Sequence, residues 1–311
     1  MAGIDEEDRT PADGPPGPRR NRLDQRLFEG ERVAGRYRVT RLIGAGAVGE
    51  VYEVEDELLH EAVALKTLRE IVAEDAVPVE RFRREIQLAR RVTHRNVCRT
   101  FDVGQHDDGE GPPLVFITME LLRGPTLAEE LASRTRFSVE DALPLVRQMV
   151  AGLEAAHAAG VVHRDFKPGN LVLVPDVDIR PTPRLVITDF GLARRSALDD
   201  ISITITGEAV GTPLYMAPEQ VAAGKQPIST ATDVYALGVV LFEMLTGELP
   251  FKGSSITVMA LKRFREAAPS PRTIRPDLDV RWERAILRCL EREPAARFQR
   301  APEALAAITQ P

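Results

Sequence analysis

The stretch HRDFKPGN, residues 163–170, decides how the rest of the chain is interpreted. It places five polar side chains in eight positions, together with a proline and a glycine, so it fits neither a helix nor a strand. An Asp, a Lys and an Asn at fixed spacing in a loop indicate catalysis, here by Asp165, Lys167 and Asn170. Such chemistry needs partner groups elsewhere in the chain.

Composition limits the classes of protein to consider. A chain of 311 residues that is 43% hydrophobic is long and apolar enough to bury a sizeable core. The net charge of −6 does not favour nucleic acid as a partner. The two cysteines, Cys98 and Cys289, lack metal-ligand spacing and are typical of buried thiols in a reducing compartment.

No membrane segment is expected within this chain. The most apolar run, residues 234–245, is too short to span a bilayer and contains Glu243, so it predicts a buried core helix. The first ten residues are acidic and lack the apolar region of a secretory signal. We therefore expect a cytoplasmic location, while a longer parent protein stays an open alternative.

The chain divides by composition into a tail and two lobes. Residues 1–30 are rich in Pro, Gly and charge and predict a flexible tail, and residues 31–311 predict one domain. Within it, residues 36–120 read mainly as strands, and residues 123–311 read mainly as helices. Ser138, with an acidic residue three positions later, predicts the start of a helix.

A glycine cluster lies between two predicted strands. Gly44, Gly46 and Gly49 have the spacing G-x-G-x-x-G, which by itself is a weak signal. A dinucleotide-binding fold requires a helix directly after these glycines, but residues 50–56 alternate as a strand does. The glycines therefore predict either an ordinary tight hairpin or a hairpin whose backbone N–H groups approach phosphate oxygens.

Three charged residues are candidate partners for this chemistry. Lys66 ends an apolar strand, and it is either a solvated lysine or a phosphate ligand held by a carboxylate such as Glu85 on the next helix. Asp189 follows the apolar run LVIT and precedes a phenylalanine and a glycine. It is either a turn residue or a hard oxygen ligand for Mg²⁺.

The order of these motifs along the chain is specific. The glycine hairpin, the strand Lys, the helix Glu, HRDxKxxN, DFG and APE (residues 217–219) follow one another. The sequence therefore resembles the eukaryotic-type protein kinases over residues 37–298. Several of its short stretches are similar to those of the bacterial branch of this family. The resemblance implies an α+β bilobal kinase fold: a small antiparallel β-sheet lobe with one main helix, and a larger, mainly helical lobe.

The resemblance also implies roles for individual residues. Catalysis would involve Asp165 as the base, with Lys167, Asn170, Lys66 and Glu85, and the two Mg²⁺ ligands would be Asn170 and Asp189. Residues implied in ATP binding are Gly44, Gly46, Gly49, Val51, Ala64, Lys66, the gatekeeper Met119, and the backbones of Glu120 and Leu122. Because Lys167 follows the Asp by two positions, the resemblance is to kinases that phosphorylate serine and threonine.

Further positions are implied in regulation and in support of the site. Arg164 before the catalytic Asp is typical of control by activation-loop phosphorylation, with Thr204 and Thr206 as the expected autophosphorylation sites. Thr212 is implied to bond across the substrate site. Structural roles are implied for Asp233, which would anchor the catalytic-loop backbone, and for a buried Glu219–Arg297 ion pair.

Two departures from the family pattern concern packing and loop length. Phe166 replaces the usual Leu or Val and is expected to pack without a chemical role. The connection of residues 174–184 is longer than usual and is expected to protrude as a surface hairpin or loop.

The expected activity is that of a non-specific serine/threonine protein kinase that uses ATP and Mg²⁺, with Mn²⁺ as an alternative metal. Its partners would be protein substrates and a transient homodimer for trans-autophosphorylation, without nucleic acid. A pseudokinase would have lost the Lys, the catalytic Asp or the metal-binding Asp, and all three are present. A small-molecule phosphotransferase of related fold is the other alternative, against which the APE segment argues.

Overall fold

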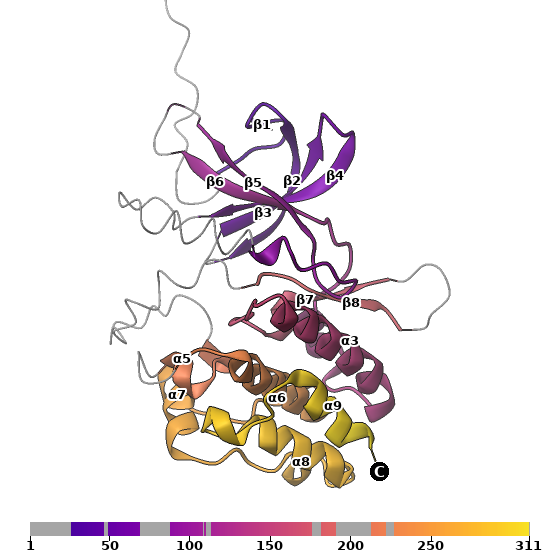
Figure 1. Cartoon of the computed structure of the whole chain (residues 1–311), viewed down its shortest axis with the longest axis vertical. Helices are drawn as coiled ribbons and strands as arrows, with labels where there is room; N and C mark the ends of the chain where they lie inside the picture. Colours follow the sequence, from indigo (N-terminus) through magenta and orange to yellow (C-terminus); the bar gives the residue numbers. More distant parts are fainter. Residues whose placement is uncertain are drawn as a thin grey trace, which may run out of the picture.

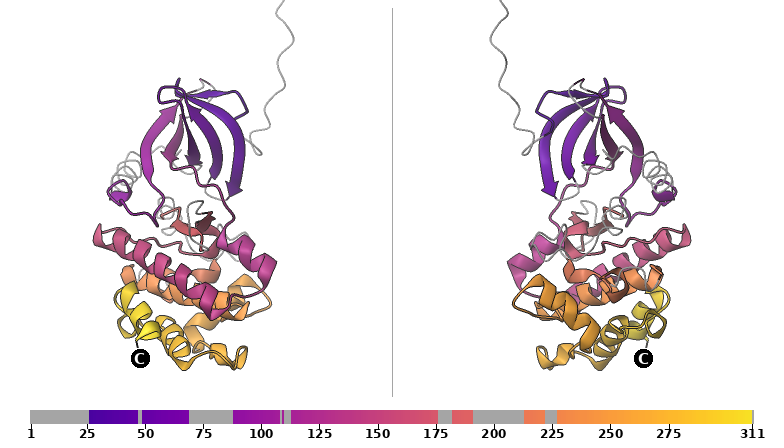
Figure 2. Two further views of the ribbon diagram at one scale, coloured as in Figure 1. Left: turned by 90° about the vertical axis from the view of Figure 1, so that its right-hand side faces the viewer. Right: turned by 90° about the vertical axis from the view of Figure 1, so that its left-hand side faces the viewer.

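The computed structural model describes residues 26–46, 49–68, 88–107, 109, 113–175, 182–190, 213–221 and 227–310. A strand-rich lobe lies above a helical lobe, as Figure 1 shows. Figure 2 shows from two sides that the sheet curves over the top of the molecule while the helices stack below it. The predicted order of a small β-lobe followed by a larger helical lobe is confirmed. The main helix expected around Glu85 lies outside the described residues.

The small lobe contains one antiparallel sheet with the strand order β1-β2-β3-β4-β6-β5. Its strands are β1 (Arg32–Val33), β2 (Tyr37–Gly46), β3 (Gly49–Asp56), β4 (Glu61–Leu68), β5 (Thr100–His106) and β6 (Leu114–Met119). The glycine cluster joins β2 to β3 as a hairpin. Because β4 pairs with strands on both sides, its apolar residues are buried, and Lys66 lies opposite Val51 of β3.

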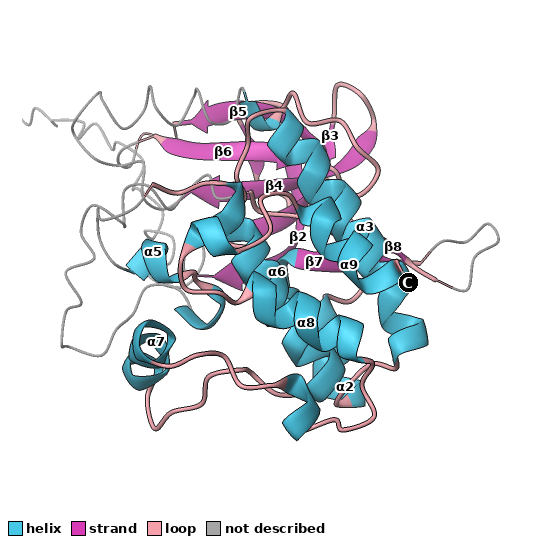
Figure 3. Ribbon diagram, turned by 60° about the horizontal axis from the view of Figure 1, so that its bottom comes forward, coloured by secondary structure: helices cyan, strands magenta, loops and turns pink. Residues whose placement is uncertain are grey.

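The large lobe consists of helices below a short second hairpin (Figure 3). Its α-helices are α2 (Leu127–Arg134), α3 (Val139–Ala158), α5 (Pro218–Val221), α6 (Thr230–Thr246), α7 (Ile256–Arg265), α8 (Val280–Cys289) and α9 (Ala301–Thr309). Short 3₁₀ turns occur at η1 (Pro168–Asn170), η2 (Pro213–Tyr215), η3 (Pro271–Thr273) and η4 (Pro294–Ala296). As predicted, α3 begins after Ser138, whose hydroxyl accepts a hydrogen bond from the Asp141 N–H at 3.0 Å.

Helix α6 forms the centre of the large lobe. Nearly all of its side chains are buried, as the apolar run in its sequence predicts. Gly238 allows α8 to approach closely, because a Cβ atom there would lie 2.6 Å from the Cβ of Cys289. Both cysteines are buried free thiols. Among the described residues, no helix has the length and apolarity needed to cross a membrane.

The two departures noted in the sequence have local structural outcomes. Phe166 is 1% exposed and packs edge-on against His163, so it belongs to the core of the large lobe. The long connection joins β7 (Leu171–Val174) to β8 (Arg184–Ile187), which pair as an antiparallel hairpin, while residues 176–181 lie outside the described part.

Residues 26–30 differ from the expectation of a flexible tail. Leu27 is 2% exposed and packs in the core of the small lobe with residues of β2, β3 and β4. Its backbone N–H donates to the Tyr52 hydroxyl at 3.2 Å. Leu27 lies in a mostly polar segment where Leu23 and Phe28 are the only large apolar neighbours, too few to establish a periodic pattern, which is why the sequence places it in the tail. Residues 1–25 lie outside the described residues.

Candidate active site

Residues 163–170, which we call the catalytic loop, are held in place by one buried carboxylate. Asp233, in the first turn of α6, is fully buried. Its Oδ2 accepts the His163 N–H at 2.7 Å, and its Oδ1 accepts the Arg164 N–H at 2.8 Å. His157 Nε2 lies 2.7 Å from the same Oδ2 atom. The hydrogen bonds to the loop backbone expected of Asp233 are thus present, and His157 is a further contact that sequence reasoning missed.

Two residues of the site adopt left-handed backbone conformations. Arg164 has φ of 66° and Asp189 has φ of 57°. Residues with a Cβ atom enter this region at a cost, and such residues cluster at functional sites where surrounding contacts hold them. At Arg164 that contact is the hydrogen bond to Asp233. The following residue, Asp165, is partly exposed, whereas His163 on the other side of Arg164 is buried.

Asp165, Lys167 and Asn170 converge in the structure. The Lys167 Nζ lies 2.8 Å from Asp165 Oδ2. The Asn170 Nδ2 donates to the Asp165 carbonyl at 2.7 Å and to Oδ2 at 3.2 Å. The Asp165 side chain is 18% exposed, so the carboxylate is held in place yet remains accessible. One carboxylate, one cation and one amide therefore form a compact polar group.

Among the described residues, Lys66 forms its ion pair with Asp189, the acid predicted as a metal ligand. Its Nζ lies 2.6 Å from Asp189 Oδ1, and this ion pair joins β4 of the small lobe to the segment after β8. The Lys66 pairing expected with Glu85 lies outside the described residues. Next to Asp189, Phe190 is buried and packs on the His163 ring at a centroid distance of 4.6 Å. His163 Nε2 also lies 2.9 Å from the Thr188 carbonyl oxygen, which fixes this segment against the catalytic loop.

Four of the residues implied in ATP binding, Val51, Ala64, Met119 and Leu122, lie in one apolar cluster. It contains Val51, Ala64, Cys98, Met119, Leu121, Leu122, Val174 and Val186. The cluster brings together β3, β4, the link between the lobes and the β7–β8 hairpin. A flat apolar base such as adenine needs apolar walls of this kind and a few backbone groups at its edge.

The link between the lobes is held by side chains that sequence reasoning did not identify. The carbonyl of Glu120 accepts from the Cys98 thiol at 3.7 Å, and its carboxylate forms an ion pair with Arg184 of β8. Arg184 is the first residue of β8 in the second hairpin, and its ion pair with Glu120 holds the link between the lobes. In the sequence it is one arginine in a long polar connection, so nothing there singled it out.

The three glycines of the hairpin differ in what they require. A Cβ atom at Gly49 would lie 1.8 Å from the Thr67 carbonyl oxygen, so only glycine fits there. At Gly44 and Gly46 a Cβ atom would meet nothing within 4 Å. Gly49 thus allows β3 and β4 to approach closely, while the tip of the hairpin has room beside it for a ligand.

The chemistry of the donor set fits a divalent cation bound together with phosphate. Mg²⁺ is usually held by one or two protein oxygens and completes its shell with phosphate oxygens and water. The Asp189 carboxylate is 32% exposed, and its Oδ1 contacts Lys66. The Nδ2 of Asn170 donates to Asp165, so the amide oxygen is the atom of Asn170 suited to a cation. The described residues hold no cluster of three or more His, Cys, Asp or Glu, and such a site does not need one.

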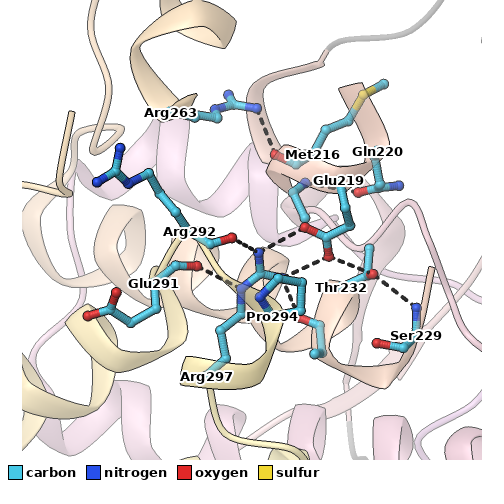
Figure 4. Close-up of polar contacts among 12 residues, drawn as sticks. Met216, Glu219, Gln220, Ser229, Thr232, Arg263, Glu291, Arg292, Pro294 and Arg297 are labelled. Carbon is cyan, nitrogen blue, oxygen red and sulfur yellow. Dashed lines mark hydrogen bonds and ion pairs between the residues drawn. The ribbon is translucent and has the colours of Figure 1, made fainter. Parts of the chain in front are cut away.

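Residues 213–221, which we call the segment after the activation loop, are bound to the large lobe by a buried ion pair. Arg297 Nη1 and Nη2 each lie 2.8 Å from one carboxylate oxygen of Glu219, and both side chains are fully buried (Figure 4). Thr232 donates to the same carboxylate at 2.8 Å. The structure thus shows the ion pair expected from the sequence. Gln220, which sequence reasoning missed, donates to the Arg164 carbonyl at 2.7 Å.

Three regulatory residues predicted from the sequence are not placed. Thr204, Thr206 and Thr212 lie outside the described residues. Arg164, the expected partner of phosphate on Thr204 and Thr206, is described, and its backbone joins Asp233 and Gln220.

The comparisons with known proteins agree with this geometry. Residues 37–307 match the protein kinase domain family. The chain is 36% identical over 277 residues to the serine/threonine-protein kinase PrkC of Bacillus subtilis, covering 89% of this chain and 40% of PrkC. It is 38% identical over 271 residues to the serine/threonine-protein kinase PknA of Mycobacterium tuberculosis, covering 87% of this chain and 60% of PknA.

Among solved structures, the crystal structure of the Mycobacterium tuberculosis PknI kinase domain is similar to this one. The TM-score is 0.71 at 29% identity, over 92% of this chain and 99% of that one. The expected bilobal kinase fold is therefore confirmed. This chain spans 40% and 60% of the lengths of PrkC and PknA. From the family match over most of its length, the chain belongs to the protein kinase family.

Proposed function

We propose that this chain is a serine/threonine protein kinase that transfers the γ-phosphoryl group of ATP to hydroxyl groups of protein substrates. The observation that carries the proposal is the convergence of Lys167 and Asn170 on Asp165, since a side-chain nitrogen of each lies within 3.2 Å of its Oδ2 atom. The Lys66–Asp189 pair adds a cation and a second acid.

In the proposed reaction, Asp165 orients the acceptor hydroxyl and takes its proton. The hydroxyl oxygen then forms a bond to the γ-phosphorus as the bond to the bridging oxygen of ADP breaks. Lys167, which contacts Asp165, neutralises negative charge that builds on the transferred group. Lys66 contributes a cation for the α- and β-phosphates and is held near them by Asp189.

Asn170 and Asp189 would hold the magnesium ions. When bound, Mg²⁺ neutralises charge on the phosphates and helps to align them, and Mn²⁺ is an alternative. The role of the protein is to keep the two oxygen ligands at fixed places. Asn170 is held by its hydrogen bonds to Asp165, and Asp189 is held by Lys66.

A protein acceptor is favoured over a small molecule. The segment Ala217–Glu219 is bound to the large lobe through Arg297, and the adjacent Gln220 binds the Arg164 carbonyl, so the place of this segment relative to the catalytic loop is fixed. The relatives PrkC and PknA are named serine/threonine-protein kinases, which supports the same acceptor group here.

The test is transfer of radiolabelled phosphate from Mg·ATP to a generic protein acceptor by the purified chain. With wild type we expect labelled phosphoserine and phosphothreonine. With Asp165→Asn the rate of phosphate transfer should fall by about a thousandfold or more, because the base is lost. Asp277→Asn is the matched control, because that side chain is 74% exposed and lies outside the site. Wild-type rates with Asp165→Asn, or ATP binding without transfer by wild type, would overturn the proposal, and the second result would indicate a pseudokinase.

Regulation by autophosphorylation is the second part of the proposal. A phosphate on Thr204 or Thr206 would add negative charge that Arg164 pairs with, and Arg164 is adjacent to the catalytic Asp165. We expect mass spectrometry after incubation with Mg·ATP to find phosphate on both threonines. The double variant Thr204→Ala/Thr206→Ala should lose activity by at least severalfold. A wild-type enzyme that is fully active without phosphate on this segment would contradict this mechanism. This holds both for transfer within one copy of the chain and for transfer between two copies.

A further inference from the structure

Arg263 is a buried arginine on α7 that the reaction as described does not use. The residue is 2% exposed. Its Nη1 donates to the Met216 carbonyl at 2.9 Å, and its Nη2 donates to the Leu214 carbonyl (Figure 4 shows the first contact). One guanidinium thus binds two carbonyl groups that are two residues apart on the segment after the activation loop.

The backbone of this segment depends on side chains for its shape. Pro213–Tyr215 is a single 3₁₀ turn, and residues 216–217 have no regular structure. Carbonyl groups in such a segment lack the partners that a helix or a sheet would supply, so a side chain must satisfy them when they are buried. The planar guanidinium is suited to this because it presents several N–H donors in fixed directions.

Placing a guanidinium here carries an energetic cost. Burial lowers the pKa of Arg263 below its ordinary value, although the group stays charged because arginine titrates far above neutral pH. A buried cation is stabilised only by well-placed acceptors. The carbonyls of Leu214 and Met216 are such acceptors, so the buried charge and the shape of the segment depend on each other.

Other contacts connect the same segment to the catalytic loop and to α6. Gln220 accepts the Ala217 N–H at 2.9 Å and donates to the Arg164 carbonyl, one residue before Asp165. The Tyr215 hydroxyl donates to Glu243 of α6 at 2.6 Å. Arg263 therefore holds the segment from α7, while Gln220 sets its place relative to the catalytic base.

We propose that Arg263 is a positioning residue for the protein acceptor. By holding the Leu214 and Met216 carbonyls, it fixes the backbone between α7 and the catalytic loop against which the acceptor polypeptide binds. The inference rests on the proposed kinase function. It predicts that Arg263 affects binding of the protein acceptor more than the nucleotide side of the reaction, because the carbonyls that it holds belong to Leu214 and Met216.

The test compares steady-state constants for the protein acceptor with those for ATP. In Arg263→Lys the charge remains, but a single ammonium group cannot reproduce both bonds of the fork. We expect KM for the protein acceptor to rise about tenfold, as expected for one lost hydrogen bond from a charged group. KM for ATP, and the slow hydrolysis of ATP with water as the acceptor, should stay within about twofold. Arg265→Lys is the matched control, an exposed arginine on the same helix, and should behave as wild type.

A second variant keeps the test decisive if Arg263→Lys folds poorly. Tyr215→Phe loosens the same segment at its contact with Glu243 of α6 without changing α7 or the catalytic loop, and it should show the same selective rise in KM for the protein acceptor. Two results would overturn the inference: an unchanged acceptor KM in a folded Arg263→Lys, or a loss of ATP hydrolysis equal to the loss of protein phosphorylation in either variant. Failure of wild type to phosphorylate any protein would instead overturn the proposed function, so the two failures are distinguishable.

Discussion

The acids that hold the backbone and the acids that would react differ in how they are bonded. Asp233 and Glu219 are buried, and in each of them both carboxylate oxygens accept hydrogen bonds. Asp165 and Asp189 have side chains that are 18% and 32% exposed. Asp233 holds the loop backbone next to Asp165, while Asp165 and Asp189 keep access to ligands. Rigidity and reactivity are thus assigned to different residues that are close in space.

The largest effect that tests this comparison is on the buried ion pair. Glu219→Gln leaves Arg297 as an uncompensated buried charge, so the free energy of unfolding should fall by about 3–5 kcal/mol. Urea denaturation measures this change. In contrast, Glu130→Gln in the exposed Glu130–Arg134 pair should cost at most about 0.5 kcal/mol. A cost for Glu219→Gln as small as that of Glu130→Gln would break the comparison, because the buried acid would then not support the fold.

The next effect is on a reacting group. Lys66→Met removes the cation proposed for the phosphates, so kcat/KM should fall about 100- to 1,000-fold, equivalent to roughly 3–4 kcal/mol of transition-state stabilisation. Its effect on unfolding should be much smaller than that of Glu219→Gln, since Asp189 is exposed enough to be solvated when it loses its partner. Phosphate transfer and urea denaturation are measured on the same samples.

Lys252→Met is the control for Lys66→Met, because the Lys252 side chain is 64% exposed and lies on the large lobe. If Lys66→Met destabilised the fold as much as Glu219→Gln does, the Lys66–Asp189 pair would be a structural element and the division between the two classes of acid would fail.

Much of the site was predictable because its residues are close in sequence or follow buried elements. The spacing within HRDFKPGN brings Asp165, Lys167 and Asn170 together in one turn, which needs no knowledge of distant contacts. Asp189 follows β8, a strand whose apolar run fixes where the acid emerges. The resemblance to a family then placed distant partners, such as Glu219 and Arg297, which no local pattern connects.

Other features were not predictable because nothing local distinguishes them. Arg263 lies in the run LKRFRE, which reads as a charged helix surface, although it is 2% exposed. Its burial depends on the segment near Met216, which is 47 residues away in sequence. Leu27 likewise packs only because the sheet that it covers forms from later residues. Such contacts arise from tertiary packing, and a pattern within a short window does not contain them.

The smallest effect concerns an acid of the large lobe that belongs to neither class. Glu243 accepts a hydrogen bond from Tyr215 at 2.6 Å, and burial raises the pKa of its carboxyl above the ordinary 4.5. The folded state therefore binds a proton more tightly than the unfolded state. As the pH falls from neutral through the folded pKa, this group should increase the free energy of unfolding, and the gain is complete below the unfolded value near 4.5.

Glu243→Gln removes this titration while it keeps an acceptor for Tyr215, so the unfolding free energy of wild type should rise relative to that of Glu243→Gln between pH ~7 and pH ~5. The difference should not exceed about 1.4 kcal/mol for each unit of raised pKa. Urea denaturation at both pH values measures it, and subtraction from wild type cancels the other titrating groups. Equal pH dependence in wild type and Glu243→Gln would show that Glu243 titrates as a solvated acid, and burial would then no longer separate the acids of the large lobe.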